Sequence, residues 1–271
     1  MTHEPSKYLD PVHAIARAAG ERILEVYRSD FGVTEKQDGS PVTVADHAAH
    51  AVIVAALAEL TPDVPVLSEE AADIAAEQRR AWTRFWLVDP LDGTKEFIQR
   101  NGQFTVNIAL IDGDRPVLGV VHTPVTGVSY LACRGAGAYK AEGAQAPRPI
   151  QARRYAGTRP VIVASRLHAG PALEGFLERV GEHELKSMGS SLKFCLVAEG
   201  QADVYPRLAP TMEWDTGAAQ CVVEQAGGRV VDTANRPLRY NKPSLRNPWL
   251  ITTGAGDFDW AHYLPVREGD A

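Results

Sequence analysis

Cysteine is scarce in this sequence, and its three cysteines, Cys133, Cys195 and Cys221, stand far apart in the chain. An odd number of widely spaced cysteines in apolar surroundings indicates neither a disulfide framework nor a thiolate metal site. We therefore expect buried free thiols in a reducing compartment, with the cytoplasm as the location.

Long apolar runs and an excess of basic residues are also missing. No stretch approaches the roughly 20 apolar residues of a membrane helix, and no secretion signal is expected. The 28 Lys and Arg against 34 Asp and Glu give a net charge of -6. Polymeric nucleic acid is therefore an unexpected partner, since it requires a basic surface. An acidic protein that handles phosphates neutralises them locally, and divalent cations can do so.

The length of 271 residues fits one large domain or two closely packed domains. Residues 1–145 combine helical patterns with antiparallel strands, which predicts an α+β unit. Residues 146–271 alternate strands with helices, which predicts an α/β unit. The boundary is expected near residue 145, because residues 143–159 are rich in Ala, Pro, Gln and Arg and lack periodicity.

Apolar spacing and turn-forming residues predict the individual elements. Helices are expected over 10–29, starting at a cap formed by Asp10-Pro11, and over 46–60, 71–82, 171–180, 191–199 and 216–226. Extended or hairpin structure is expected over 33–44 around Asp38-Gly39. Strands are expected over 64–67, 85–88, 104–111, 117–122, 128–133, 161–164, 185–188, 204–205, 230–231 and 250–253.

The segment Asp89-Pro90-Leu91-Asp92-Gly93-Thr94 follows an apolar strand and carries two carboxylates three positions apart. The proline restrains the backbone, so the turn can aim the Leu91 carbonyl at the same point as both carboxylates, as a hard cation requires. Gly93 permits close approach of a ligand, and Thr94 offers an amide and a hydroxyl to a metal-bound phosphate. A plain hairpin is the alternative, because these residues are also common turn formers.

Further acidic residues can join this site, each with a structural alternative. Glu69-Glu70 follows a short strand at the head of a helix, where acidic residues also favour the first turn. Asp46 and Asp215 each stand at a helix start, where capping is the alternative. If Asp46 bonds to the Thr94 hydroxyl, the pair can orient and deprotonate a water aimed at phosphorus.

Together these motifs resemble the lithium-sensitive, magnesium-dependent phosphatase superfamily that includes the inositol monophosphatases. Its pattern is Asp, then Glu-Glu, then Asp-Pro-Ile/Leu-Asp-Gly/Ser-Thr, then Trp-Asp, eleven residues and Gly-Gly. The chain meets this pattern in order, with Asp46, Glu69-Glu70, Asp89 to Thr94, Trp214-Asp215 and Gly227-Gly228. The resemblance implies a layered α/β/α/β/α sandwich, of the inositol monophosphatase and fructose-1,6-bisphosphatase type, with metals bound between the halves.

The same resemblance implies a role for each matching residue. It assigns two or three Mg²⁺ ions: one held by Glu69, Asp89 and the Leu91 carbonyl, one held by Asp89, Asp92 and Asp215, and a third, looser ion at Glu69. It assigns catalysis to Asp46, Thr94 and Glu69, and contact with the phosphate to the Gly93 and Thr94 amides.

Within this superfamily the chain resembles the CysQ-type 3'(2'),5'-bisphosphate nucleotidases rather than the inositol monophosphatases. The likeness is densest over residues 41–46, 85–97 and 189–207, and Lys95-Glu96-Phe97 stands where inositol monophosphatases usually carry an Asn-Phe pair. It implies a phosphorylated nucleotide substrate, 3'-phosphoadenosine 5'-phosphate (PAP), cleaved to AMP in sulfate assimilation, with 3'-phosphoadenosine 5'-phosphosulfate (PAPS) as a second substrate. Candidate substrate contacts are Lys193, Arg207, Ser165 and His168; solvated charges and a structural histidine are the alternatives.

Two other functions remain open from the sequence. A phosphatase of the same superfamily can act on inositol phosphates or on fructose 1,6-bisphosphate. A noncatalytic metal-dependent nucleotide sensor would keep the ligands without turnover, but it would have no need of the pair Asp46 and Thr94. The sequence leaves the oligomeric state undefined, and a homodimer is compatible with it.

Overall fold

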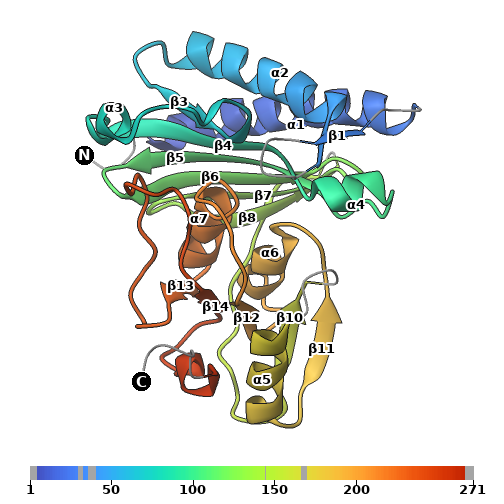
Figure 1. Cartoon of the computed structure of the whole chain (residues 1–271), viewed down its shortest axis with the longest axis vertical. Coiled ribbons are helices and arrows are strands. Elements are labelled where there is room, and N and C mark those ends of the chain that lie inside the picture. The colour runs from blue at the N-terminus through green and yellow to red at the C-terminus, as the bar shows by residue number, and fades with distance from the viewer. Residues whose placement is uncertain (1–4, 30–32, 36–40, 144, 166–169, 266–271) are drawn as a thin grey trace.

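A computed structural model describes residues 5–29, 33–35, 41–143, 145–165 and 170–265. Its elements form five layers, in which helices and sheets alternate (Figure 1). The predicted layered α/β/α/β/α sandwich is confirmed. The layers explain how acidic residues from both halves of the chain reach one place, because the two sheets face each other across a shared layer of helices.

The outer helical layer covers one face of the first sheet (Figure 1). It contains α1 (Leu9–Tyr27) and α2 (Val44–Leu60). The predicted cap at Asp10-Pro11 is wrong: a 3-10 helix, η1 (Pro5–Tyr8), runs directly into α1, so Tyr8 is the N-cap and Asp10 lies in the first turn. The predicted hairpin between these helices is present as β1 (Val33–Glu35) paired antiparallel with β2 (Pro41–Thr43), and the residues expected at its tip lie outside the described residues.

The first sheet has seven strands in the order β3-β4-β5-β6-β7-β8-β9. Its strands are β3 (Val66–Ser68), β4 (Arg84–Asp92), β5 (Thr105–Asp112), β6 (Arg115–Thr123), β7 (Val128–Cys133), β8 (Gly137–Glu142) and β9 (Arg148–Pro149). All neighbours pair antiparallel except β3 and β4, which are parallel, so the predicted antiparallel meander is confirmed.

Two expectations around β4 need correction. The strand does not end at Val88 but continues to Asp92, with a register shift against β5 between Asp89 and Asp92. The predicted helix over 71–82 is mostly absent, and the structure has only η2 (Glu69–Ala71) and α3 (Ala76–Arg80) there. A tight turn interrupts the helix, because the Ile74 amide bonds to the Ala72 carbonyl at 2.8 Å.

The second sheet has five strands in the order β11-β10-β12-β14-β13. The strands are β10 (Val161–Ala164), β11 (Glu184–Ser187), β12 (Val204–Arg207), β13 (Arg229–Asp232) and β14 (Leu250–Thr253). Its helices are α5 (Pro171–Val180), α6 (Leu192–Ala198), α7 (Gly217–Gln225) and the 3-10 helix η3 (Trp260–Tyr263). The predicted alternation of strands and helices is confirmed, with each boundary within about two residues.

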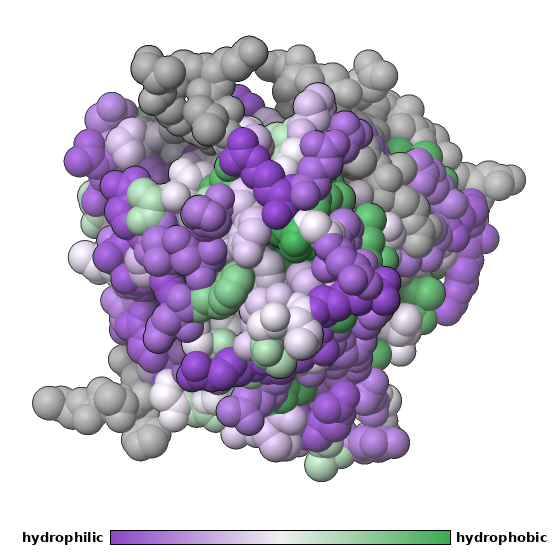
Figure 2. Space-filling model, turned by 90° about the horizontal axis from the view of Figure 1, so that it is seen from below, coloured by the Kyte–Doolittle hydropathy of each residue, from purple (hydrophilic) through white to green (hydrophobic). Residues whose placement is uncertain are grey.

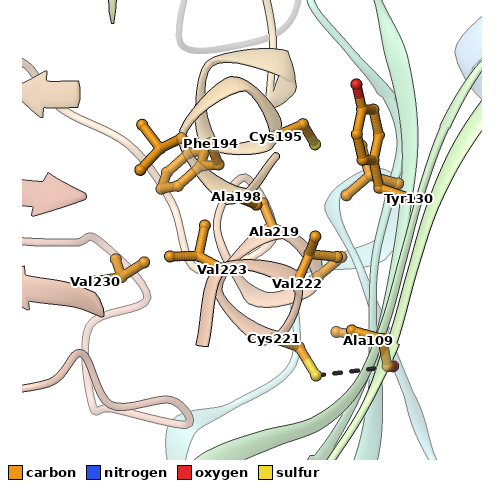
Figure 3. Packing of buried hydrophobic residues seen from close by; sticks show 14 of the residues in the cluster. Ala109, Tyr130, Phe194, Cys195, Ala198, Ala219, Cys221, Val222, Val223 and Val230 are labelled. Carbon is orange, nitrogen blue, oxygen red and sulfur yellow. Dashed lines mark hydrogen bonds between the residues drawn. The ribbon is translucent and has the colours of Figure 1, made fainter. Parts of the chain in front are cut away.

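Helices α6 and α7 lie between the two sheets and bury side chains from both (Figure 1). Figure 3 shows Phe194 of α6 and Val222 of α7 within one hydrophobic cluster that also includes Tyr130 of β7. The helix approaches the sheet closely at Gly119 of β6, where a Cβ atom would lie 2.2 Å from the Ala218 carbonyl oxygen of α7. This cluster contains residues from both sides of residue 145. The predicted division of the chain into two domains there stays a prediction.

The three cysteines are all buried and free, as the sequence predicts. Among the described helices, none has the length and apolar character that crossing a membrane requires. On the face seen from below in Figure 2, hydrophilic side chains predominate and hydrophobic ones are scattered among them.

Candidate metal and phosphate site

The end of β4 carries the two carboxylates of the Asp89–Thr94 motif. Asp89 is buried, and its Oδ1 accepts a hydrogen bond from the Leu91 amide at 3.1 Å. Gly93 has a φ of 95°, a left-handed conformation that glycine adopts without steric cost, and α4 (Thr94–Ile98) begins directly after it. The glycine therefore turns the chain from the strand into the helix at the point where the carboxylates gather.

Two segments distant in sequence bring further carboxylates to Asp89. Glu69 begins η2 at the end of β3, beside β4, and Asp215 lies just before α7. One ligand atom from each of Glu69, Asp89 and Asp215 lies within 4.8 Å of the others. This group of three described residues is close enough together to hold a metal ion.

The electrostatics of this group favour a bound cation. Burial, followed by the charges of Glu69, Asp92 and Asp215, raises the pKa of Asp89 well above its usual range. Burial and the neighbouring Asp92 raise the pKa of Asp215 to about 8. A divalent cation removes this conflict, because buried like-charged carboxylates become stable when they coordinate a metal. Oxygen-only donors of this kind suit Mg²⁺.

Asp92 lies outside the group of three carboxylates whose ligand atoms come within 4.8 Å of one another. Its Oδ2 accepts hydrogen bonds from the Ser190 hydroxyl at 2.7 Å, the Ser191 amide at 2.6 Å and the Ser191 hydroxyl at 2.7 Å. Asp92 therefore ties the end of β4 to the start of α6. Its predicted part in a second metal site stays a prediction.

Asp46 and Thr94 lie together, as the sequence led us to expect. The Thr94 hydroxyl is 3.4 Å from Asp46 Oδ1, and Asp46 is buried. The other carboxylate oxygen accepts the Thr43 amide and the Thr43 hydroxyl, both at 2.7 Å, as half of a capping box whose N-cap is Thr43. Asp46 thus belongs to a cap and also faces Thr94. Asp215 is not an N-cap, because that position belongs to Thr216.

A pocket of about 200 Å³ opens beside these carboxylates. It collects predicted metal, phosphate and substrate residues from both halves of the chain. Its walls are formed by Glu69, Asp92, Gly93, Thr94, Lys95, Glu96, Ser165, Ser190, Ser191, Lys193, Phe194, Tyr205, Arg207, Thr211 and Asp215. The pocket therefore places the acidic group next to the predicted basic residues Lys193 and Arg207.

Lys193 and Arg207 differ in their surroundings. Lys193 is 5 % exposed and donates to the Ser190 carbonyl at 2.6 Å; burial lowers the pKa of its ammonium group to about 8. Arg207 donates through Nη2 to the Pro210 carbonyl at 3.0 Å. Its buried Nε has no hydrogen-bond partner among the described residues. An anion in the pocket can satisfy such a donor.

Ser165 and His168 are the two residues predicted to contact the nucleotide. Ser165 lines the pocket, whereas His168 lies outside the described residues. Sequence reasoning assigned no role to Ser190, Ser191 or Glu96. The serines stand in the segment 189–207 that carries the resemblance, and Ser190 has a positive φ of 54°, a strained conformation that local sequence did not indicate.

The fold and this arrangement of carboxylates correspond to a known family. The family model described as "Inositol monophosphatase family" matches residues 4–252. The chain belongs to the inositol monophosphatase family. The resemblance that the motifs indicated is therefore confirmed.

Individual relatives narrow the likeness to one branch of the family. The chain is 53 % identical over 243 residues to the 3'(2'),5'-bisphosphate nucleotidase CysQ of Escherichia coli (strain K12), covering 89 % of this chain and 97 % of the relative. It is 51 % identical to the CysQ of Salmonella typhimurium, covering 90 % and 99 %. The crystal structure of CysQ from Bacteroides thetaiotaomicron superposes with a TM-score of 0.82 at 43 % identity, covering 93 % of this chain and 98 % of that one.

Proposed function

We propose that this chain is a Mg²⁺-dependent 3'(2'),5'-bisphosphate nucleotidase that hydrolyses the 3'-phosphate of PAP to give AMP and phosphate. PAPS is the proposed second substrate, and sulfate assimilation in the cytoplasm the proposed setting. One observation carries the proposal: a single pocket joins the acidic group to Lys193 and Arg207. A bisphosphate substrate needs both, because its second phosphate requires cationic contacts away from the metals.

The acidic residues would divide the metal ions among them. Glu69, Asp89 and the Leu91 carbonyl would hold one Mg²⁺, and Asp89, Asp92 and Asp215 a second, with a third near Glu69. When bound, the ions polarise the phosphoryl group, lower the pKa of a coordinated water and stabilise the leaving ribose oxygen. The three carboxylates within 4.8 Å of one another support this assignment.

Asp46 and Thr94 would orient the attacking water. The Thr43 amide and hydroxyl hold Asp46 Oδ2, so the carboxylate presents Oδ1 toward Thr94 in a fixed direction. Asp46 Oδ1 would then accept a proton from the water while the water oxygen attacks phosphorus. The ribose oxygen would leave with a proton from solvent. Glu69 would contribute to catalysis as one of the residues that hold a metal ion.

The remaining pocket residues would hold the substrate. The Gly93 and Thr94 amides would meet the oxygens of the scissile phosphate. Lys193 and Arg207 would contact the second phosphate, and Ser165 and His168 the nucleotide. Lys193 is pre-positioned for this by its bond to Ser190 and by the Tyr205 ring, whose centroid lies 5.4 Å from its Nζ.

Phosphate release from PAP, measured beside inositol 1-phosphate and fructose 1,6-bisphosphate, tests the proposal. Each assay is run with Mg²⁺ and then with added Li⁺. We expect a preference for PAP and inhibition by Li⁺. A preference for either other substrate would refute the substrate assignment, and no release from any of them would favour a nucleotide sensor instead.

A further inference from the structure

The turn that carries Asp215 contacts a loop from the C-terminal part of the chain, residues 240–247. Asn247 donates through Nδ2 to the Met212 carbonyl at 2.7 Å and to the Thr216 hydroxyl at 3.1 Å. Inside the turn, the Met212 amide donates to Asp215 Oδ2 at 2.8 Å. The 240–247 loop therefore contacts the turn on both sides of Asp215.

Glu213 anchors the same loop through its side chain, which is fully buried. Its carboxylate accepts hydrogen bonds from the Asn241 amide at 2.7 Å, the Lys242 amide at 3.1 Å and the Lys242 ammonium at 2.6 Å. A buried carboxylate with three donors has a defined position. Since Glu213 is two residues before Asp215, the loop fixes the backbone from which Asp215 projects.

Arg79 joins the opposite side of the loop to the segment that carries Glu69. This arginine is 3 % exposed and donates to Asn241 Oδ1 at 3.2 Å and to the carbonyls of Lys242 and Pro243, both at 3.3 Å. Asn241 returns a bond through Nδ2 to the Arg79 carbonyl at 2.7 Å. A further bond runs back along its own segment, from Arg79 Nε to the Ile74 carbonyl at 3.1 Å.

The two anchored segments also contribute to one hydrophobic cluster. Ala72 and Ile74, which follow Glu69 closely, pack against the hydrophobic cluster that contains Trp214 and Leu245. The loop therefore fastens the segment after Glu69 and the turn before Asp215 to one another. Glu69 and Asp215 are two of the three residues whose ligand atoms lie within 4.8 Å of one another.

We propose that Arg79, Asn241 and Glu213 are positioning residues for the metal site: through the 240–247 loop they hold Glu69 and Asp215 at the spacing a divalent cation needs. The inference rests on the proposed metal site. Residues that orient metal ligands from outside the coordination sphere typically change metal affinity by about 10- to 100-fold. The Arg79 side of the loop reaches Glu69 through several residues, so we expect the lower end of this range.

The first test compares Asn241→Gly with Asn235→Gly. Both asparagines have a φ of 60°, a conformation that glycine accepts, and the side-chain oxygen of each accepts a bond from an arginine. Asn235 lies in an exposed turn after β13, and its side chain accepts its bond from Arg229. Mn²⁺ binding is measured by electron paramagnetic resonance on the full chain, with the melting temperature recorded for each variant.

We expect Asn241→Gly to weaken Mn²⁺ binding about 10-fold, and Asn235→Gly to leave it within about twofold.

A second pair, Glu213→Gln and Asp203→Asn, repeats the comparison. Asp203 is 5 % exposed and accepts three bonds, two from Arg153 and one from the Val161 amide. Both substitutions weaken the ion pair of a buried carboxylate, so both lower the melting temperature, but only Glu213→Gln is expected to weaken Mn²⁺ binding.

Three outcomes separate the inference from the proposed function. Weaker binding in Asn241→Gly and Glu213→Gln alone supports the inference. Unchanged Mn²⁺ affinity in a folded Asn241→Gly variant, or equal losses in the control variants, overturns it while leaving the metal site in place. If the unaltered chain binds no Mn²⁺, the proposed metal site fails, and the inference fails with it.

Discussion

The Thr94 hydroxyl lies 3.4 Å from Asp46 Oδ1, although the two residues are 48 positions apart in the chain. One comes from the start of α4 and the other from the first turn of α2. The Thr43 amide and hydroxyl hold the other oxygen of Asp46, so the geometry of the pair is set by a helix cap.

Asp46→Asn is expected to reduce kcat about 10²- to 10⁴-fold, because an amide cannot accept the proton of the attacking water. Mg²⁺ activation and the melting temperature are expected to change little, since asparagine still accepts the Thr43 amide. Steady-state kinetics on PAP check this, with Asp63→Asn, on an exposed turn after α2, as the control. A kcat close to that of the unaltered chain would remove Asp46 from the mechanism.

Arg207→Gln is expected to reduce the preference for PAP over 3'-AMP, which lacks the second phosphate. The change in the ratio of kcat/KM values should be about 10- to 100-fold, the range for one charge-assisted hydrogen bond. Arg236→Gln serves as the control, because the side chain of Arg236 is 77 % exposed. An unchanged ratio would show that Arg207 does not contact that phosphate.

Gly119→Ala is expected to destabilise the chain by several kcal/mol, because its Cβ would lie 2.2 Å from the Ala218 carbonyl oxygen and force β6 and α7 apart. Gly175→Ala, inside α5, places its Cβ 3.6 Å from Pro265 and should instead add about 0.5 to 1 kcal/mol. Urea unfolding of both variants measures the difference. Equal stabilities would contradict this account of the packing.

The free energy of unfolding is expected to decrease as the pH falls below 6.5, because His122 then takes up a proton in the unfolded state but not in the folded state. Burial first, then His13 and Arg17, lower the pKa of His122 from 6.5 to about 4. Ser129 accepts or donates bonds at 2.8 Å to His122 and at 2.9 Å to His13. The folded pKa lies below the unfolded one, so the stabilisation is present above pH 6.5 and is lost as the pH falls toward 4.

The comparison with His122→Asn isolates this effect from other titrating groups. Between pH 7.5 and pH 5, the free energy of unfolding of the unaltered chain should fall by about 2 kcal/mol more than that of the variant. Urea titrations at both pH values give the difference. A difference that does not depend on pH would mean that the folded chain tolerates a charged His122.

Local patterns made part of the site predictable. Asp89, Leu91 and Asp92 lie within four residues, and the short motif limits how far apart their oxygens can lie. The partners of Asp92 were not predictable, because Ser190 and Ser191 follow it by 98 and 99 positions and approach only when α6 packs between the sheets. The contacts of Glu213 with Lys242 arise in the same way, from packing that no local pattern encodes.

The fold showed the same division between local and distant information. Alternation of apolar residues placed the strands β5 to β7 within a residue or two, because their periodicity is a property of the strand itself. The helix expected over 71–82 failed, because a turn at Ala72–Ile74 interrupts it and the Arg79 side chain donates to Asn241, which is distant in the sequence. Tertiary contacts there override a weak local preference.

The position of α6 and α7 between the sheets has a consequence for synthesis. The seven strands of the first sheet are complete at Pro149, whereas α7, which covers their inner face, ends only at Gln225. At typical translation rates of about 5 to 20 residues per second, the nascent chain spends roughly 4 to 15 s with that apolar face uncovered. This interval is the stage at which chaperone binding on the ribosome should matter most for the yield of this protein.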